Sequence, residues 1–208
     1  MPSTAFDSLV AMLRARPLAR DASIEEVRDR FERMAPLLGA PPDVVSVAPC
    51  TFAGLRAERF TPGGAPCESV VLYLHGGGYC IGSLNTHRNF AARLAEASGT
   101  ALVSIEYRLA PEHPFPAAVD DAMSAYRALV REGHSPARIG IGGDSAGGGL
   151  ALATLAALRD AGDPLPAAGF CLSPWTDLAN TGASVVTKAP DDPVLEPWEL
   201  HDFARRYL

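Results

Sequence analysis

The sequence predicts an α/β protein with a mostly parallel, doubly wound sheet and a helical cap. Two apolar runs of strand length, 70–74 and 101–107, alternate with stretches that carry apolar residues at helical spacing. Such nearly uninterrupted runs are typical of strands covered on both faces. A third run, 139–142, leads directly into a glycine-flanked serine and a long apolar helix. With 208 residues, 48% of them hydrophobic, the chain is long enough for one domain with a sizeable core.

Residues 1–42 predict two amphipathic helices ahead of any strand. Thr4 is a candidate cap for the first helix. Its apolar residues share one face: Phe6, Leu9, Val10 and Leu13. Ser23 and Glu26 form a capping box for the second helix, whose apolar rhythm continues to Leu38. Both helices must lay their apolar stripes on elements built later, so this segment is predicted to be an N-terminal cap.

The rest of the chain supplies the predicted core and a final helix. Residues 44–60 predict two short strands, and 61–66 predict a loop. The later predicted elements follow in order: helices at 89–98 and 119–133, a strand at 167–173, loop-like chain at 177–193, and a helix opened by Pro197.

Composition limits the partners and the location. The net charge of −6 and the pI near 5.3 argue against nucleic acid and anionic membranes, so the predicted partner is a small neutral molecule. Asp7 and Arg14 interrupt any signal-peptide core, and no run is long enough to span a bilayer, so we expect a cytoplasmic protein. Four cysteines without metal-ligand spacing are predicted to be free thiols: Cys50, Cys67, Cys80 and Cys171.

A candidate nucleophile lies between the run 139–142 and the helix after it. Residues 143–147 read G-D-S-A-G and fit the G-x-S-x-G pattern, in which the serine sits on a turn too tight for bulky neighbours two residues away. Glycine-rich serine turns also form phosphate loops and ordinary bends. The strand on one side and the helix on the other favour Ser145 as a catalytic nucleophile.

A glycine-rich loop follows the strand 70–74, with the sequence H-G-G-G at 75–78. Ester hydrolysis passes through a tetrahedral intermediate whose negative oxygen is stabilised by preorganised backbone N–H groups. A loop without side chains allows its backbone to approach a substrate that closely. The alternative is that the glycines merely form a tight loop.

Three motifs occur in one order along most of the chain: H-G-G-G at 75–78, Y-R-L-A-P-E-H-P-F-P-A at 107–117 and G-D-S-A-G-G at 143–148. Together they resemble the α/β-hydrolases of the bacterial hormone-sensitive-lipase-like esterase family, which includes the epsilon-lactone hydrolases. The segment S-P-W-T-D-L at 173–178 adds weaker support.

The resemblance implies an α/β-hydrolase fold and an oxyanion hole. Its donors would be the N–H groups of Gly77, Gly78 and Ala146. The resemblance also implies that 43–180 is an incomplete hydrolase core and that 181–208 begins a second cap segment.

Other polar residues near these motifs are interpreted as structural. His75 precedes the glycines, whereas the expected base follows the serine in chain order. His113, with Arg108 and Glu112, is predicted to hold the proline-rich connection by hydrogen bonds. Asp144 is predicted to be a hydrogen-bonding turn residue.

A serine nucleophile needs a base, and the base needs an acid to orient it. The sequence contains one histidine after Ser145, namely His201, with Asp191 or Asp192 as a candidate acid. This triad has the right chain order, but by resemblance each partner should follow a further strand. We therefore expect His201 to be a solvated helix residue, and the last strands with the acid and the histidine to lie beyond this chain.

Such an ending would leave the strand 167–173 as an uncovered apolar sheet edge. We expect a chain of this extent to be poorly soluble or homo-oligomeric, and nearly inactive.

Two classes of function follow. The first is a carboxylesterase or lactonase that cleaves short-chain esters or lactones through an acyl-enzyme on Ser145 and requires no metal or cofactor. The second is an inactive fragment or a non-catalytic ligand-binding protein that keeps the pocket but lacks the base.

Overall fold

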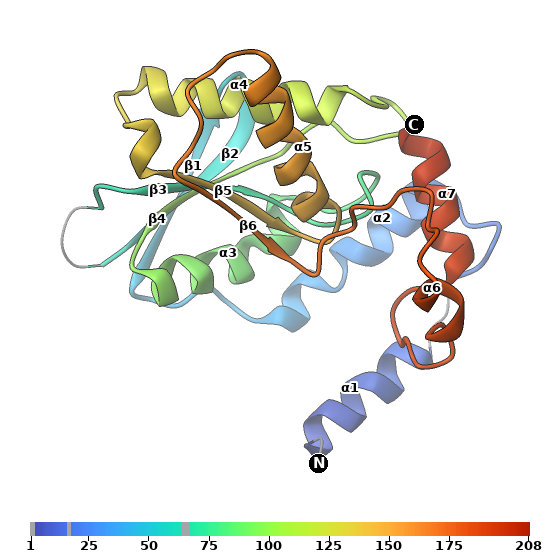
Figure 1. The fold of residues 1–208 in the computed structure, drawn as a ribbon. Coiled ribbons are helices and arrows are strands. Elements are labelled where there is room, and N and C mark those ends of the chain that lie inside the picture. Colours follow the sequence, from blue (N-terminus) through green and yellow to red (C-terminus); the bar gives the residue numbers. More distant parts are fainter. Residues whose placement is uncertain (1–2, 16–17, 64–66) are drawn as a thin grey trace.

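The computed structural model describes residues 3–15, 18–63 and 67–208. Its centre is a six-stranded sheet with the order β1-β2-β4-β3-β5-β6 (Figure 1). The strands are β1 (Val45–Phe52), β2 (Leu55–Pro62), β3 (Val70–Leu74), β4 (Ala101–Ile105), β5 (Ile139–Asp144) and β6 (Ala168–Leu172). Strands β4, β3, β5 and β6 run parallel, and the β1–β2 hairpin joins β4 antiparallel. The predicted mostly parallel sheet is confirmed.

Helices cover both faces of the sheet (Figure 1). They are α3 (Leu84–Ser98) on one face, and α4 (Ala117–Arg131) and α5 (Ala146–Asp160) on the other. Alternate residues of β3 divide between the two layers. Leu72 and Leu74 belong to the core cluster that contains α4 and α5, whereas Tyr73 packs with the alanines of α3. Four of the five residues of β3 are buried, as this double covering leads one to expect.

The segments predicted to form the cap contain α1 (Thr4–Arg14), α2 (Ile24–Glu32), a 3₁₀ turn (Ala35–Leu38), α6 (Ser184–Thr187) and α7 (Pro197–Tyr207). The capping box of Ser23 and Glu26 and the opening of α7 by Pro197 are both confirmed. The predicted cap at Thr4 is wrong by one residue, because the Ser3 hydroxyl accepts the hydrogen bond from the Phe6 N–H.

Two other element bounds differ from the prediction. Helix α2 ends at Glu32 although the apolar rhythm continues, because Pro36 lacks an N–H and the chain tightens into the 3₁₀ turn. The stretch 89–98 does lie in a helix, as predicted, and this helix, α3, begins at Leu84 because Ser83 and Thr86 form a capping box there. Of the predicted loop 61–66, residues 61 and 62 belong to β2, and 64–66 lie outside the described residues.

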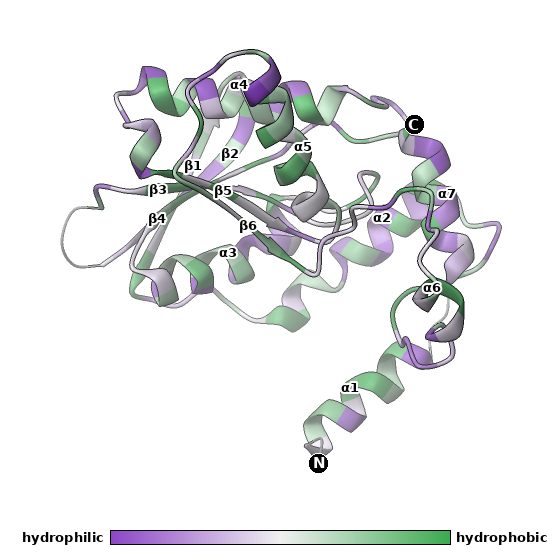
Figure 2. Ribbon diagram, in the orientation of Figure 1, coloured by the Kyte–Doolittle hydropathy of each residue, from purple (hydrophilic) through white to green (hydrophobic). Residues whose placement is uncertain are grey.

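The apolar stripe of α1 is less covered than predicted. Phe6 and Leu9 are exposed, and Figure 2 shows the hydrophobic residues of α1 lying apart from the sheet. Within the described part of the chain, β6 pairs with β5 alone, and its Leu172 is exposed. The expected uncovered apolar edge is therefore present among these residues, while its effect on solubility stays a prediction.

The junction of β3, β5 and α5 depends on glycine. A Cβ atom on Gly147 would lie 2.0 Å from the Leu74 carbonyl oxygen, whereas one on Gly140 would meet no atom closer than 3.5 Å. We expect Gly147→Ala to lower the free energy of unfolding by about 3 kcal/mol or more, because only backbone movement relieves the clash. Gly140→Ala, the matched control, should change it by less than about 1 kcal/mol. Urea denaturation measures both, and equal stabilities of the two variants would contradict the packing argument.

Candidate active site

Ser145 lies at the tip of a sharp turn between β5 and α5, with φ 49° and ψ −121°. This region of backbone space is sparsely populated for a residue with a side chain and stores strain. The surroundings hold the turn: the Ser145 N–H donates to the Leu172 carbonyl at 2.9 Å, and the Ser145 carbonyl accepts from Trp175 N–H at 2.9 Å. The predicted strand, turn and helix around Ser145 are therefore confirmed.

The glycine loop turns back on itself directly beside this elbow. The N–H groups of Cys80 and Ile81 donate to the Gly77 carbonyl at 3.0 and 2.9 Å. Gly77 and Gly78 have φ 126° and 59°, which glycine adopts readily. Within the described residues, the N–H groups of Gly77, Gly78 and Ala146 donate no hydrogen bond inside the protein. Of these three predicted donors, Gly77 and Gly78 line the cavity described below, and Ala146 is buried beside Ser145.

Asp144 joins the glycine loop to the end of β5, next to Ser145. Its Oδ1 accepts from the Tyr73 hydroxyl at 2.5 Å and from the Gly76 N–H at 2.9 Å, and its Oδ2 lies 3.5 Å from Nε2 of His87. Burial by itself raises the pKa of Asp144, but the hydrogen bonds from His87, Tyr73 and Gly76 outweigh it and hold the pKa below its ordinary value. Asp144 does form hydrogen bonds, as predicted, but its partners lie on other elements rather than in its own turn.

His75 is structural, as predicted. Its ring is fully buried and stacks on Tyr107 with ring centroids 4.3 Å apart. Its Nδ1 lies 2.8 Å from the Gly76 carbonyl oxygen, and the Tyr107 hydroxyl donates to the His75 carbonyl at 2.7 Å. Burial lowers the pKa of His75 to about 3, with His87 adding to the shift, so the ring is neutral at ordinary pH.

The proline-rich connection is held by partners that the sequence analysis did not identify. Arg108 pairs with Asp121 of α4 at 2.7 Å, while the His113 side chain is exposed. Glu112 forms a bidentate pair with Arg28 of α2, at 2.7 Å for each contact. Arg108 and Glu112 therefore hold the connection by hydrogen bonds, as predicted, whereas the described hydrogen bonds include none from the His113 side chain. No local signal in the sequence pointed to Arg28 or Asp121.

Arg28 also reaches the glycine loop. Its Nε donates to the Cys80 carbonyl at 2.8 Å, and its Nη2 donates to the Ala110 carbonyl at 2.9 Å. The hydrogen bond from Arg28 lowers the pKa of Glu112 to about 2. One guanidinium therefore joins the first cap segment, the loop and the proline-rich connection.

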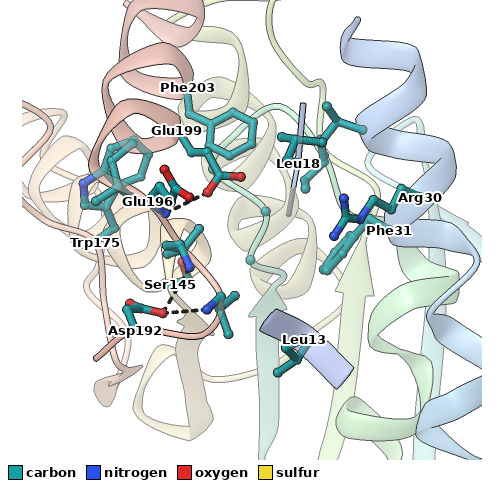
Figure 3. Close-up of a pocket in the computed structure, with 18 of the residues that line it drawn as sticks. Leu13, Leu18, Arg30, Phe31, Ser145, Trp175, Asp192, Glu196, Glu199 and Phe203 are labelled. Atoms are coloured by element: carbon teal, nitrogen blue, oxygen red, sulfur yellow. Dashed lines mark hydrogen bonds between the residues drawn. The ribbon is translucent and has the colours of Figure 1, made fainter. Parts of the chain in front are cut away.

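A cavity of about 380 Å³ opens over Ser145 (Figure 3). Gly76, Gly77 and Gly78 form part of its wall, and both cap segments supply apolar side chains. Those from α2 and the chain before it include Leu18, Val27 and Phe31, and those from α7 include Trp198, Leu200 and Phe203. Arg30 and Glu199 face the cavity from opposite sides (Figure 3), and burial raises the pKa of Glu199. Phe31 lines the cavity and also packs against the hydrophobic core.

The structure does not bring the candidate triad together. His201 is exposed beside Asn180 and is absent from the described lining of the cavity. Asp192 does line the cavity, but its Oδ1 is occupied by the N–H groups of Val194 and Leu195, at 2.7 and 3.0 Å. Within the described residues, the Ser145 hydroxyl has no hydrogen-bond partner.

His87 is a lining residue that the sequence analysis missed. Its Nδ1 lies 2.8 Å from the Thr86 hydroxyl, and its Nε2 faces Asp144. Both ring nitrogens therefore serve the network that holds the loop. A single histidine in the first turn of a helix gives no motif that would have identified it.

The parallel sheet, the strained serine turn and the glycine loop define an α/β-hydrolase. A family model described as alpha/beta hydrolase fold matches residues 71–208. An acetyl-hydrolase of Streptomyces hygroscopicus is 46% identical over 193 residues, which are 91% of this chain and 62% of that protein. An esterase of Mycobacterium tuberculosis is 36% identical over 211 residues, covering 96% and 65% of the two chains.

Solved structures of esterases are also similar to this chain. The crystal structure of an esterase from the bacterial hormone-sensitive lipase family superposes with a TM-score of 0.94 at 43% identity, over 100% of this chain and 70% of that one. The crystal structure of EstE5 superposes with a TM-score of 0.93 at 40% sequence identity, over 100% of this chain and 70% of that one. The chain belongs to the bacterial hormone-sensitive-lipase-like family of α/β-hydrolases. It spans about 62% of the length of the Streptomyces relative.

The buried neutral His75 makes stability depend on pH. The unfolded chain binds a proton on this ring below about pH 6.5, whereas the folded chain does not until about pH 3. We therefore expect the free energy of unfolding to fall as the pH drops from about 6.5 to about 5, with a His75 contribution approaching about 1.4 kcal/mol per pH unit. In His75→Asn, urea denaturation across this range should show a shallower slope. An unchanged slope would contradict the assignment.

The Asp144 carboxylate is expected to stabilise the folded chain through the hydrogen bonds that it accepts from Tyr73 and Gly76. Asp144→Ala leaves the Gly76 N–H and the Tyr73 hydroxyl without their acceptor and should cost about 2–4 kcal/mol in the free energy of unfolding. Asp160→Ala, which removes an exposed ion pair with Arg159, should cost less than about 1 kcal/mol. Thermal or urea unfolding compares them, and a loss at Asp144 no larger than at Asp160 would refute this role.

Proposed function

We propose that this chain carries the nucleophile and the oxyanion hole of a serine esterase. The observation that supports this most directly is that Ser145, on its strained turn, faces the same cavity as Gly77 and Gly78. Their N–H groups and that of Ala146 have no acceptor among the described residues. A nucleophile beside unoccupied backbone donors is the arrangement that acyl transfer needs.

In the proposed reaction, Ser145 Oγ attacks the ester carbonyl carbon while a base takes its proton. The carbonyl oxygen becomes negative and accepts hydrogen bonds from the amides of Gly77, Gly78 and Ala146. Ala146 is the first residue of α5, so the positive end of the helix dipole adds to the stabilisation. The alcohol leaves, and water then releases the acid from the acyl-enzyme.

The proposed substrate is a short-chain carboxylic ester or a lactone. Relatives of this chain are named acetyl-hydrolase and esterase, and the apolar lining of the cavity suits a small neutral acyl group. We further propose that residues 1–42 and 181–208 form the cap over a core at 43–180, because both segments contribute walls to the cavity. No helix in the described part of the chain has the length and apolar character needed to cross a bilayer. The cytoplasmic location stays a prediction.

A second candidate function is ligand binding without catalysis. It is favoured by the isolated Ser145 hydroxyl and by the position of His201 away from the cavity. Without a base, the cavity and the donors would bind an ester but leave the serine unactivated.

A phosphonate label and an ester assay separate the two functions. We expect p-nitrophenyl butyrate hydrolysis by the 208-residue chain, or by its form extended through any reading frame that follows Leu208. Ser145→Ala should lower kcat by about 10⁴-fold or more, because no other group forms the acyl-enzyme. A fluorophosphonate probe should label Ser145 in the active form, and mass spectrometry identifies the site.

The matched control is Ser46→Ala, which changes an exposed serine on β1 and should leave hydrolysis unchanged. Hydrolysis that survives Ser145→Ala would overturn the proposal. Ester binding without labelling or turnover in both forms would establish the binding protein instead.

A further inference from the structure

The loop that carries Gly77 and Gly78 packs against two aromatic side chains of helix α7. We propose that Tyr207, assisted by Phe203, is a positioning residue for this loop: its ring holds Tyr79 in a left-handed backbone conformation and so fixes the direction of the preceding amides. This inference rests on the proposed role of the loop as an oxyanion hole.

Tyr79 is the strained residue of the loop. Its φ of 62° follows directly on the positive φ of Gly77 and Gly78, and a residue with a side chain adopts this region only at an energetic cost. Such a conformation persists only when the surroundings impose it. The loop bonds from Cys80 and Ile81 to the Gly77 carbonyl close the turn but do not contact the Tyr79 ring.

The Tyr79 ring is held by aromatic contacts. It stacks on Tyr207 with ring centroids 3.9 Å apart and an interplanar angle of 8°, and Trp175 packs near it at 6.0 Å. Tyr79 and Tyr207 are both almost fully buried, at 4% and 3% exposure. A stacked aromatic pair contributes to stability beyond its buried area, so this contact opposes the backbone strain at Tyr79.

Phe203, one turn before Tyr207, contacts the loop at Gly78. A Cβ atom on Gly78 would lie 2.7 Å from Cδ2 of Phe203, so the ring rests directly on the Gly78 backbone. Phe203 also faces the cavity (Figure 3). One helix face therefore covers both Gly78 and Tyr79.

Tyr207 is itself fixed from outside the loop. Its carbonyl accepts from the Phe115 N–H at 2.7 Å, and the Phe115 ring meets the Tyr207 ring edge-on at 6.1 Å. Helix α7 also lines the cavity through Glu199 and Leu200. A ligand that displaces α7 would therefore change the geometry of the loop, which couples occupation of the cap to the direction of the Gly77 and Gly78 amides.

Amide hydrogen exchange tests the inference without requiring turnover. The N–H groups of Cys80 and Ile81 report on the closed loop, and that of Val103 in β4 reports on the central sheet. In Tyr207→Ala we expect NMR to show exchange at Cys80 and Ile81 at least about tenfold faster, with Val103 within about threefold of the unmodified chain. Tyr207→Phe keeps the stacked ring and should behave like the unmodified chain. Tyr207→Leu, which cannot stack, should resemble Tyr207→Ala and replaces it if the alanine variant does not fold.

The control for general destabilisation is Leu129→Ala, a buried residue of α4 far along the chain from the loop. It should not accelerate exchange at Cys80 or Ile81 more than at Val103. Equal local acceleration by Leu129→Ala and Tyr207→Ala, or unchanged exchange in Tyr207→Ala, would overturn the inference.

A double-mutant cycle tests the strain itself. Because glycine adopts positive φ readily, Tyr207→Ala should accelerate loop exchange by less than about threefold in a Tyr79→Gly background. A full tenfold effect in that background would refute the mechanism.

In whichever form hydrolyses esters, Tyr207→Ala should lower kcat about tenfold or more with KM within about threefold, since the amides act on the transition state. Absent turnover with the expected exchange pattern would reject the esterase and keep the positioning role.

Discussion

The contact between the carboxyl ends of β3 and β5 controls the geometry of the whole site. Gly143 and Gly147 bring the Ser145 turn against the Leu74 carbonyl, where no side chain would fit. Asp144 then spans the junction, because its carboxylate accepts from Tyr73 on β3 and from Gly76 in the loop. Ser145 and the glycine loop are thus parts of one hydrogen-bonded corner of the sheet, and the helices on either side pack around it.

The sequence predicted this corner because its signals are local. A five-residue pattern specifies the turn around Ser145, a run of glycines specifies the loop, and the apolar runs specify the strands that carry them. The free thiols were also predictable from cysteine spacing and are present in the structure. The predicted end of a helix was wrong where a local rule competed with hydrophobic periodicity. Helix α2 stops at Glu32, ahead of Pro36, although the apolar rhythm continues.

The supports of the corner were not predictable, because each comes from a distant part of the chain. Arg28 precedes the Cys80 carbonyl by 52 residues, and His87 and Tyr207 lie on helices whose sequence patterns indicate only burial or exposure. A hydrogen bond or a ring stack between such positions leaves no periodic trace in the sequence. The structure is therefore needed to separate the groups that perform chemistry from those that hold them.

Through Arg28, the predicted cap takes part in the hydrogen bonding of the chain beneath it. Its guanidinium donates to the Cys80 and Ala110 carbonyls and pairs with Glu112. Helix α2, which lines the cavity, therefore also completes the hydrogen bonding of the glycine loop and the proline-rich connection. Deleting α2 would leave two main-chain acceptors without their donor. Removing α2 would therefore alter the hydrogen bonding of the site as well as widen access to it. A chimera that takes this segment from a relative would need an arginine that reaches the same two carbonyls. Lysine, with one ammonium group in place of a planar fork, could not serve all three partners at once.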